Sequence, residues 1–173
     1  RMREWGHLVI GVVALMISNK ILSGQEPDVC RKMLEDTLTN HQMNLLSYEV
    51  LPDEREIIVQ RLQALCQTGA SPVVLTLGGT GVRPTDWVPE ATREVIDKEI
   101  PGIAEAMRAE SLKKVRTAML SRGIAGIKDK TVIINLPGSP KGMKENCEVV
   151  LPLLDHIVQK IGFSHTKKDS ACS

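Results

Sequence analysis

The stretch that best predicts the fold is Pro72-Val73-Val74-Leu75-Thr76-Leu77, which runs directly into Gly78-Gly79-Thr80-Gly81. A short run of Val and Leu bounded by turn residues is typical of a strand buried on both faces, as in a parallel sheet. The glycines allow a sharp turn with unshielded backbone N–H groups, which makes a concave site for an anion. The loop lacks the Lys and Ser/Thr of a Walker A motif, and Pro84 stands where a Rossmann fingerprint has its third glycine. A tight turn that binds nothing is the alternative interpretation, because short glycine clusters are weak evidence.

Strands and helices are predicted to alternate around this stretch. Apolar runs predict further strands over Leu8–Ile17, Leu45–Leu51 and Thr131–Leu136. Apolar residues at helical spacing predict helices over Pro27–Thr39, Asp53–Gln67, Pro89–Lys98, Gly102–Lys114 and Lys141–Lys160, the second of them starting with a capping box of Asp53 and Glu56. This alternation predicts an α/β fold, a three-layer α/β/α arrangement with a mostly parallel sheet.

Composition predicts one folded domain over residues 8–163, with an N-terminal extension over 1–7 and a polar tail or linker over 164–173. The chain has 173 residues, which suits a single core, and 42% of them are hydrophobic. Lys plus Arg total 22 against 21 Asp plus Glu, with few aromatic residues, so we expect no nucleic-acid partner. The missing initiator Met and the polar end suggest either a trimmed chain or one domain of a longer polypeptide.

Cysteine and histidine spacing, and the lengths of the apolar runs, exclude several other classes. The longest apolar run is too short to cross a bilayer and carries no cleavage pattern, so we expect no membrane span and a cytoplasmic location. The four cysteines form no CxxC pair, which predicts reduced, mostly buried thiols, and the four histidines show no metal-ligand spacing.

Candidate site residues follow the predicted strands. Ligands of such sheets bind beyond the carboxyl ends of the strands, here after Leu51, Leu77 and Leu136. Asp53 follows the first of these ends and Asp86 follows the second, and two carboxylates beside a phosphate loop suit a Mg²⁺ ion. The alternatives are that Asp53 caps a helix and that Asp86 is an ordinary turn residue.

A second loop, Pro137-Gly138-Ser139-Pro140, lies between the last predicted strand and the last helix. The free N–H groups of Gly138 and Ser139, with the positive end of the helix, could hold an anion. Simple punctuation between a strand and a helix is the alternative.

The order of these motifs resembles a known family more strongly than any one motif does. The motifs are Leu51-Pro52-Asp53-Glu54, then Leu75 to Gly81, then Asp86 with Pro89-Glu90-Ala91-Thr92, then Met119-Leu120-Ser121-Arg122, then Ile133 to Pro140. In this order they resemble the molybdopterin adenylyltransferase family, which includes the bacterial MogA and MoaB proteins and the G domains of gephyrin and its plant counterpart. The resemblance covers nearly the whole chain and is closest to the eukaryotic-type G domains from Leu51 onward.

The resemblance implies an enzyme of molybdenum cofactor biosynthesis. Its members transfer AMP from ATP to the terminal phosphate of molybdopterin, usually as homotrimers, and pass the product to a molybdenum-insertion domain that is fused or separate. It implies that Asp53 and Asp86 are catalytic and hold Mg²⁺, and that the glycine loop holds the molybdopterin phosphate. The implied substrate-binding residues are Ser18, Thr76, Gly78, Gly79, Thr80, Gly81, Ser121, Asn135, Pro137, Gly138 and Ser139.

Two segments differ from the family pattern. The usual Ser-Asp after the first strand is Ser18-Asn19 here, and the usual Arg-Asp-Val-Thr-Pro is Thr85-Asp86-Trp87-Val88-Pro89. These differences leave a second function open, that of a non-catalytic molybdopterin-binding or scaffold module with the same fold. A pocket blocked by Trp87 would favour that alternative.

Overall fold

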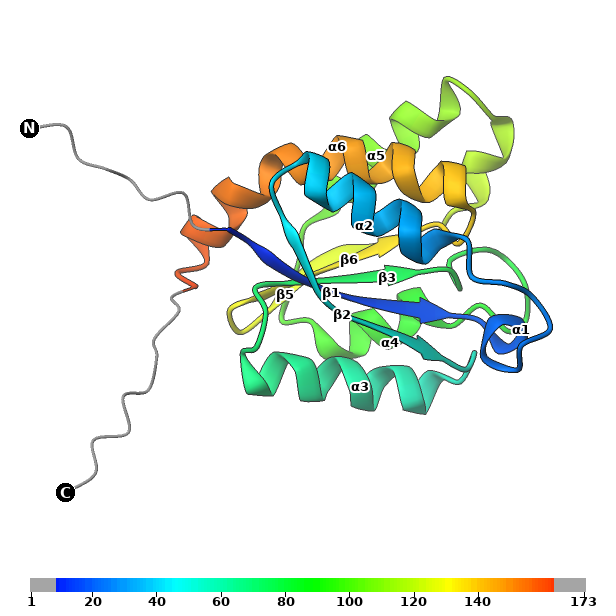
Figure 1. Ribbon diagram of the computed structural model, residues 1–173, viewed down its shortest axis with the longest axis horizontal. Helices are drawn as coiled ribbons and strands as arrows, with labels where there is room; N and C mark the ends of the chain where they lie inside the picture. Colours follow the sequence, from blue (N-terminus) through cyan, green and yellow to red (C-terminus); the bar gives the residue numbers. More distant parts are fainter. Residues whose placement is uncertain (1–8, 164–173) are drawn as a thin grey trace, which may run out of the picture.

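A six-stranded sheet forms the middle layer of residues 9–163, the part of the chain that the computed structural model describes (Figure 1). The strand order is β2-β1-β3-β6-β5-β4. The strands span Gly11–Ile17 (β1), Asn44–Leu51 (β2), Val73–Leu77 (β3), Lys98–Glu99 (β4), Ala125–Lys128 (β5) and Thr131–Leu136 (β6). β2, β1, β3 and β6 pair in parallel, whereas β5 and β4 add to the β6 edge in antiparallel fashion. The prediction of a mostly parallel sheet is therefore confirmed.

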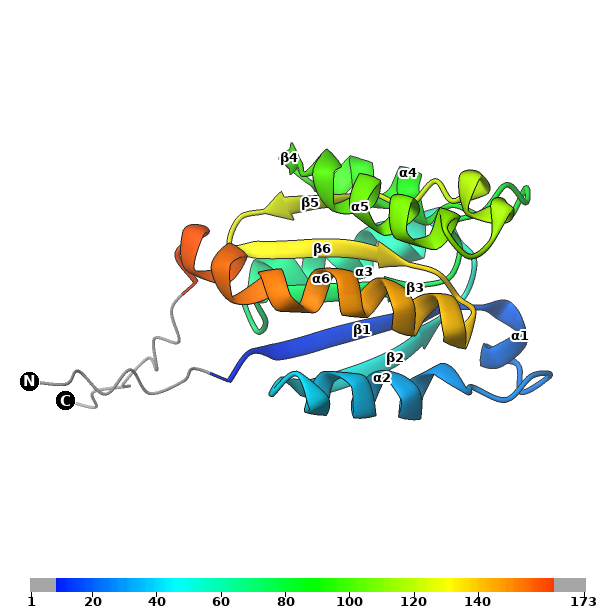
Figure 2. The same cartoon turned by 90° about the horizontal axis from the view of Figure 1, so that it is seen from above.

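Helices cover both faces of the sheet, which gives the expected three layers (Figure 2). α2 (Cys30–Asn40), α5 (Pro101–Leu112) and α6 (Pro140–Lys160) lie on one face, and α3 (Arg55–Thr68) and α4 (Val88–Val95) lie on the other. Two short helices, α1 (Asn19–Leu22) and the 3₁₀ helix η1 (Arg116–Leu120), belong to the loops at the carboxyl edge of the sheet.

The central strands read as continuous apolar runs because both of their faces are buried. In β1, Ala14 packs toward α2 and α6 while its neighbour Leu15 packs toward α3, and neither side chain is exposed. Ala14 pairs with Tyr48 of β2 on one side and with Leu75 of β3 on the other. β1 is followed in the chain by β2 on one side and then by β3 on the other, so the strand order switches direction between β1 and β3. Such a switch point is where a doubly covered sheet leaves a crevice for ligands.

The structure corrects two helix predictions. α3 begins at Arg55 with Glu54 as its N-cap, and no side chain caps it, so the predicted capping box of Asp53 and Glu56 is wrong. The Asp53 carboxylate instead accepts a hydrogen bond from the backbone N–H of Asn19. The helix expected to reach Lys98 ends at Val95, because the chain turns extended there and Lys98 enters β4.

The cysteine prediction is confirmed for the described residues. Cys30, Cys66 and Cys147 are buried free thiols. Burial is the main cause that raises the pKa of Cys30 and Cys66 to about 11 and that of Cys147 to about 12, so these thiols are protonated and unreactive at neutral pH. Cys172, the extension over 1–7 and the tail over 164–173 lie outside the described residues. Within residues 9–163, no helix is both long and apolar enough to span a membrane.

Candidate active site

The carboxyl ends of the four parallel strands surround one large cavity of about 1060 Å³. Each strand contributes the residues that directly follow it. These are Ser18, Asn19 and Lys20 after β1, Asp53 after β2, Gly78 to Arg83 with Thr85 and Asp86 after β3, and Pro137 to Ser139 after β6. Segments far apart in the sequence therefore meet at the switch point of the sheet.

The glycine loop after β3 has the backbone geometry of an anion site. Gly78 and Gly79 both have positive φ angles, +91° and +67°. A Cβ atom at Gly79 would lie 2.5 Å from Cγ2 of the buried Val88, and one at Gly78 would lie 2.9 Å from the carbonyl oxygen of Ile17. Within residues 9–163, the backbone N–H groups from Gly79 to Gly81 donate to no acceptor. Consecutive N–H groups left free in a concave loop can together bind a phosphate.

The loop after β6 lies against the glycine loop. A Cβ atom at Gly138 would come within 3.0 Å of the Cα atom of Gly78, so the two backbones touch. Ser139 is the N-cap of α6, and its Oγ accepts a hydrogen bond from the N–H of Gly142 at 3.3 Å. The N-terminal end of this long helix carries a partial positive charge. Two elements that favour anions therefore border the same cavity.

Asp53 is held by a reciprocal pair of hydrogen bonds with Asn19. The backbone N–H of Asn19 donates to Asp53 Oδ2 at 3.2 Å, and the backbone N–H of Asp53 donates to Asn19 Oδ1 at 2.9 Å. Burial raises the pKa of the Asp53 carboxyl, and the nearby charge of Asp86 adds to this rise. The hydrogen bond from Asn19 and the charge of Arg83 oppose it without cancelling it. A cation bound beside Asp53 would stabilise the charged form of this carboxyl and so oppose the rise in its pKa.

Asp86 enters the cavity from the loop after β3. Its Oδ2 accepts a hydrogen bond from the backbone N–H of Arg83 at 2.9 Å. A Cβ atom at Gly81 would lie 2.8 Å from the same oxygen, so the carboxylate has this place because position 81 is glycine. Asp53 and Asp86 therefore reach one cavity from two separate loops, as expected.

These carboxylates fit a substrate-borne Mg²⁺ ion better than a metal held by protein alone. Residues 9–163 contain no group of three or more His, Cys, Asp or Glu side chains that could hold a metal ion. Mg²⁺ characteristically takes one or two carboxylates and fills its remaining positions with phosphate oxygens and water. A pair of carboxylates beside two anion-binding loops matches that pattern.

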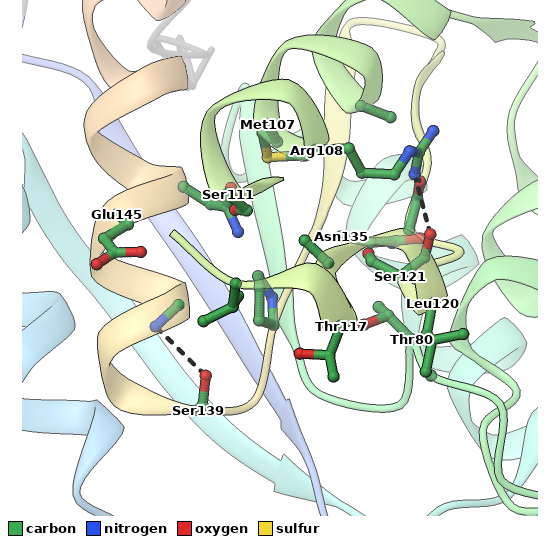
Figure 3. A pocket seen from close by; sticks show the side chains of 18 residues that line it. Thr80, Met107, Arg108, Ser111, Thr117, Leu120, Ser121, Asn135, Ser139 and Glu145 are labelled. Carbon is green, nitrogen blue, oxygen red and sulfur yellow. Dashed lines mark hydrogen bonds between the residues drawn. The ribbon is translucent and has the colours of Figure 1, made fainter. Parts of the chain in front are cut away.

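Figure 3 shows a smaller side pocket of about 260 Å³. It adjoins the large cavity. The two share Thr80, Leu120 and Ser139 among their lining residues. The side pocket has apolar walls, among them Ala104 and Met107 of α5. A few polar groups from α5, η1 and α6 also line it, namely Arg108, Ser111, Thr117, Glu145 and Asn146. Such a lining suits a flat heterocycle with polar edges.

The structure brings the expected site residues together with one exception. Ser18, Asp53, Gly78 to Gly81, Asp86 and Pro137 to Ser139 line the large cavity, and Ser121 and Asn135 line the side pocket. Thr76 lines neither, because its side chain is fully buried in β3. Its Oγ1 accepts a hydrogen bond from Asn135 Nδ2 at 3.0 Å, so Thr76 supports a pocket residue from below and does not itself contact the pocket.

Several basic residues of the site were not expected. Lys20 and Arg83 line the large cavity, and Arg108 lines the side pocket, where it donates to the carbonyl oxygens of Ser121 and Gly123. Lys20 is also paired with Glu26 at 3.5 Å. The net charge of the sequence is close to zero, so it does not indicate a basic site. These residues come together at one edge of the sheet only in the folded protein.

The fold and the site define a class, that of three-layer α/β proteins with a polar cavity at the switch point of a mostly parallel sheet. The chain belongs to the family whose model is described as a probable molybdopterin binding domain, which matches residues 13–156.

Similar proteins of known name agree with this family. A molybdopterin adenylyltransferase of Helicobacter pylori is 40% identical over 154 residues, which are 88% of this chain and 88% of that protein. The molybdenum cofactor synthesis protein cinnamon of Drosophila melanogaster is 40% identical over 144 residues, which are 80% of this chain but 24% of that protein. The crystal structure of the molybdopterin biosynthesis enzyme MoaB of Thermus thermophilus has a TM-score of 0.83 and 40% identity, covering 88% of this chain and 96% of that one.

Proposed function

We propose that this protein is a molybdopterin adenylyltransferase, a nucleotidyltransferase of molybdenum cofactor biosynthesis. Relatives that bear this name are 40% identical over most of both chains. In the reaction, an oxygen of the terminal phosphate of molybdopterin attacks the α-phosphorus of ATP. The bond from that phosphorus to the bridging oxygen of the β-phosphate breaks, so adenylyl-molybdopterin forms and pyrophosphate leaves. The observation that carries the proposal is the meeting of two anion-binding loops and two carboxylates on one cavity.

The main task of such a site is to bring two polyanions into contact. Free N–H groups of the glycine loop and the N-terminal end of α6 offer fixed partial positive charges, which cost no reorganisation during the reaction. Lys20 and Arg83 add full charges at the rim of the cavity. We assign the molybdopterin phosphate to Gly78 to Gly81, with Ser18 and Thr80 as further hydroxyl ligands.

Asp53 and Asp86 are the residues that would hold Mg²⁺. The ion supplies charge neutralisation and geometric order to the phosphates of bound ATP. Asp53 contributes a carboxylate whose pKa is raised by burial first and by Asp86 second, so it gains more from a cation than an exposed carboxylate would. No side chain needs to act as a nucleophile, because the substrate phosphate is one.

The side pocket is assigned to the ring system of a substrate. It opens into the large cavity beside Thr80 and Ser139, so a ring placed there keeps its phosphates near the glycine loop. Ser121 and Arg108 line its wall. The side-chain amide of Asn135 is bonded within the protein, because its Nδ2 donates to Thr76 Oγ1 and its Oδ1 accepts from the backbone N–H of Ile124. Trp87 lines neither the cavity nor the side pocket, so nothing favours a site blocked by this residue.

A direct assay tests the proposed reaction. Purified protein with molybdopterin, ATP and Mg²⁺ should yield adenylyl-molybdopterin and pyrophosphate in equal amounts. The Asp86→Asn variant, which keeps the shape of the side chain, should lose this turnover by at least about 100-fold, the size expected for a group that stabilises transition-state charge. A folded wild-type protein that binds molybdopterin and makes neither product would refute the enzyme and leave the binding module.

We further propose a homotrimer, a reducing cytoplasmic location and transfer of the product to a molybdenum-insertion domain, fused or separate. The apolar side chains of Leu112 and Met119 are exposed where α5 leads into η1 and line neither the cavity nor the side pocket, which supports a subunit contact there. Light scattering at micromolar concentration should give about three times the chain mass of 19.0 kDa. The Met119→Glu variant should give a smaller species. A wild-type mass equal to that of one chain would contradict the trimer.

A further inference from the structure

Arg122 lies behind the loop that carries Asp86 and binds that loop at both ends. Its backbone N–H donates to the carbonyl oxygen of Thr80 at 2.8 Å, and its Nε donates to that of Gly81 at 2.7 Å. Its Nη2 donates to the carbonyl oxygen of Asp86 at 2.8 Å, and its Nη1 pairs with the carboxylate of Glu90. The side chain lines neither the cavity nor the side pocket, so it does not contact a ligand there.

The loop between these two ends is closed by its own hydrogen bonds. Asp86 donates its backbone N–H to the carbonyl oxygen of Arg83 at 3.0 Å, and its carboxylate accepts the N–H of Arg83. The direction of the carboxylate therefore depends on where the first and last carbonyls of the loop, those of Gly81 and Asp86, are held. One planar guanidinium holds both, with its donors in a fixed fork.

Glu90 fixes the guanidinium from the other side. It lies in the first turn of α4, and its second carboxylate oxygen is buried without a hydrogen-bond partner. Burial works to raise the pKa of the Glu90 carboxyl, but the hydrogen bond from Arg122, that from the backbone N–H of Glu90 itself and the charges of Arg122 and Arg93 outweigh it and leave the pKa below its usual value. The chain Glu90–Arg122–loop thus connects a packed helix to the carboxylate in the cavity.

We propose that Arg122 is a positioning residue that sets the place of the Asp86 carboxylate through the carbonyls of Gly81 and Asp86. Its catalytic consequence rests on the proposed function, whereas its effect on the loop does not. Lysine keeps the charge but has a single donor nitrogen, so it can pair with Glu90 but must release the carbonyl of Gly81, that of Asp86 or both, while the backbone bond to Thr80 remains. A purely stabilising ion pair would tolerate this exchange, because its charge is conserved.

Three variants of the full chain separate these readings. Arg122→Lys removes the fork, Glu90→Gln keeps an acceptor for Arg122 but removes its countercharge, and Arg61→Lys is the matched control. Arg61 pairs with Glu49 through Nε at 2.6 Å, is similarly exposed, and lines neither the cavity nor the side pocket. Hydrogen exchange of a peptide covering residues 80–88 reports the loop without any need for turnover.

In Arg122→Lys we expect exchange in residues 80–88 to rise about tenfold while the rest of the chain exchanges as in wild type. The kcat should fall by about 10- to 100-fold, as for a misplaced catalytic group, with the KM for molybdopterin nearly unchanged and the Mg²⁺ concentration for half-maximal rate increased. Glu90→Gln should lie between Arg122→Lys and wild type in both measurements, and it carries the test if the lysine variant does not fold. Arg61→Lys should match wild type.

Wild-type loop exchange and wild-type kcat in Arg122→Lys would overturn the inference, as would faster exchange spread evenly over the chain. If the wild-type protein has no adenylyltransferase activity but loop exchange still rises in Arg122→Lys, the proposed function fails and the inference about the loop stands.

Discussion

At the scale of single residues, Asp53 should favour activity at the expense of stability. A carboxyl with a raised pKa binds its proton more tightly in the folded protein than in the unfolded one. The protonated Asp53 carboxyl therefore contributes fully to the free energy of unfolding at low pH, and this contribution is lost as the pH rises through the folded pKa. At pH 7 the ionised carboxylate destabilises the fold. Asp53→Asn should lower kcat by at least about 100-fold. It should also raise the unfolding temperature at pH 7 by about 1–3 °C, and this gain should vanish toward pH 4.

Thermal unfolding between pH 4 and pH 8, measured beside the activity assay, checks this prediction. Glu54→Gln is the matched control, because Glu54 is the neighbouring carboxylate, is exposed, and caps nothing with its side chain. A variant that is less stable than wild type at every pH would contradict the proposed strain at Asp53.

Gly79 belongs to the same scale, since one Cβ atom is enough to disturb the loop. Gly79→Ala places a side chain at a φ of +67° and 2.5 Å from a buried methyl group of Val88. We expect a loss of about 1–3 kcal/mol in the free energy of unfolding, measured in urea, and weaker binding of inorganic phosphate. Gly102→Ala is the control, because its Cβ would meet nothing within 4 Å and it lies inside α5, where alanine is favoured. Equal effects of the two substitutions would rule out a special role for the loop backbone.

At the scale of elements, the N-terminus of α6 combines a structural cap with a candidate anion site. Ser139→Ala removes the hydrogen bond to the N–H of Gly142 and should cost about 1 kcal/mol, or about 2–4 °C in unfolding temperature. Ser139→Asp restores a cap and should recover most of that stability, yet it places a negative charge where we assign a phosphate. Calorimetry with inorganic phosphate should therefore show binding weakened by at least about tenfold in Ser139→Asp, one added like charge at close range.

Ser18→Ala provides the comparison among helix caps. Ser18 caps α1, a helix of 4 residues without a buried side chain, so its loss should change the unfolding temperature less than Ser139→Ala does. Unchanged phosphate binding in Ser139→Asp would remove the helix terminus from the site.

The elements also show which parts of the fold local sequence can predict. β3 and β6 match their predicted runs closely, because every residue of these strands is buried and the apolar pattern is continuous. The sequence did not predict β4 and β5. The two residues of β4 are exposed, so they show no apolar pattern, and the bonds around them join residues far apart in the chain, such as the one from the N–H of Asp97 to the carbonyl oxygen of Ile127.

The candidate site likewise contains residues that local sequence predicts and contacts that it does not. Glycine loops and aspartates next to strand ends were found because their signals are local. Asp53 was given a local helix cap, whereas its actual partner Asn19 lies 34 residues earlier in the chain. Arg122 stood in a quoted motif without a role, because its contacts with Gly81 and Asp86 exist only after folding.

At the scale of the whole molecule, the cavity connects both hydrophobic layers. Residues after β1 and β3 line it, and these strands bury side chains on both faces of the sheet. The N-terminus of α6 also borders the cavity, and α6 packs in one layer, whereas α4, which follows the loop that carries Asp86, packs in the other. Binding of ATP with Mg²⁺ should therefore stabilise the domain as a unit and leave one unfolding transition. At a ligand concentration of 100 times Kd the gain is about 2.7 kcal/mol, which corresponds to a rise of about 5–10 °C in unfolding temperature.

Scanning calorimetry with ATP and Mg²⁺, with ATP and a chelator, and with Asp86→Asn would measure this coupling. The shift should be largest for wild type with both ligands and should shrink by more than half in the other two cases, because the carboxylates then gain no cation. If ATP shifted the transition equally with and without Mg²⁺, the nucleotide would bind without the carboxylate pair. Two separate transitions in the presence of ligand would instead show that the layers unfold independently and that the cavity does not couple them.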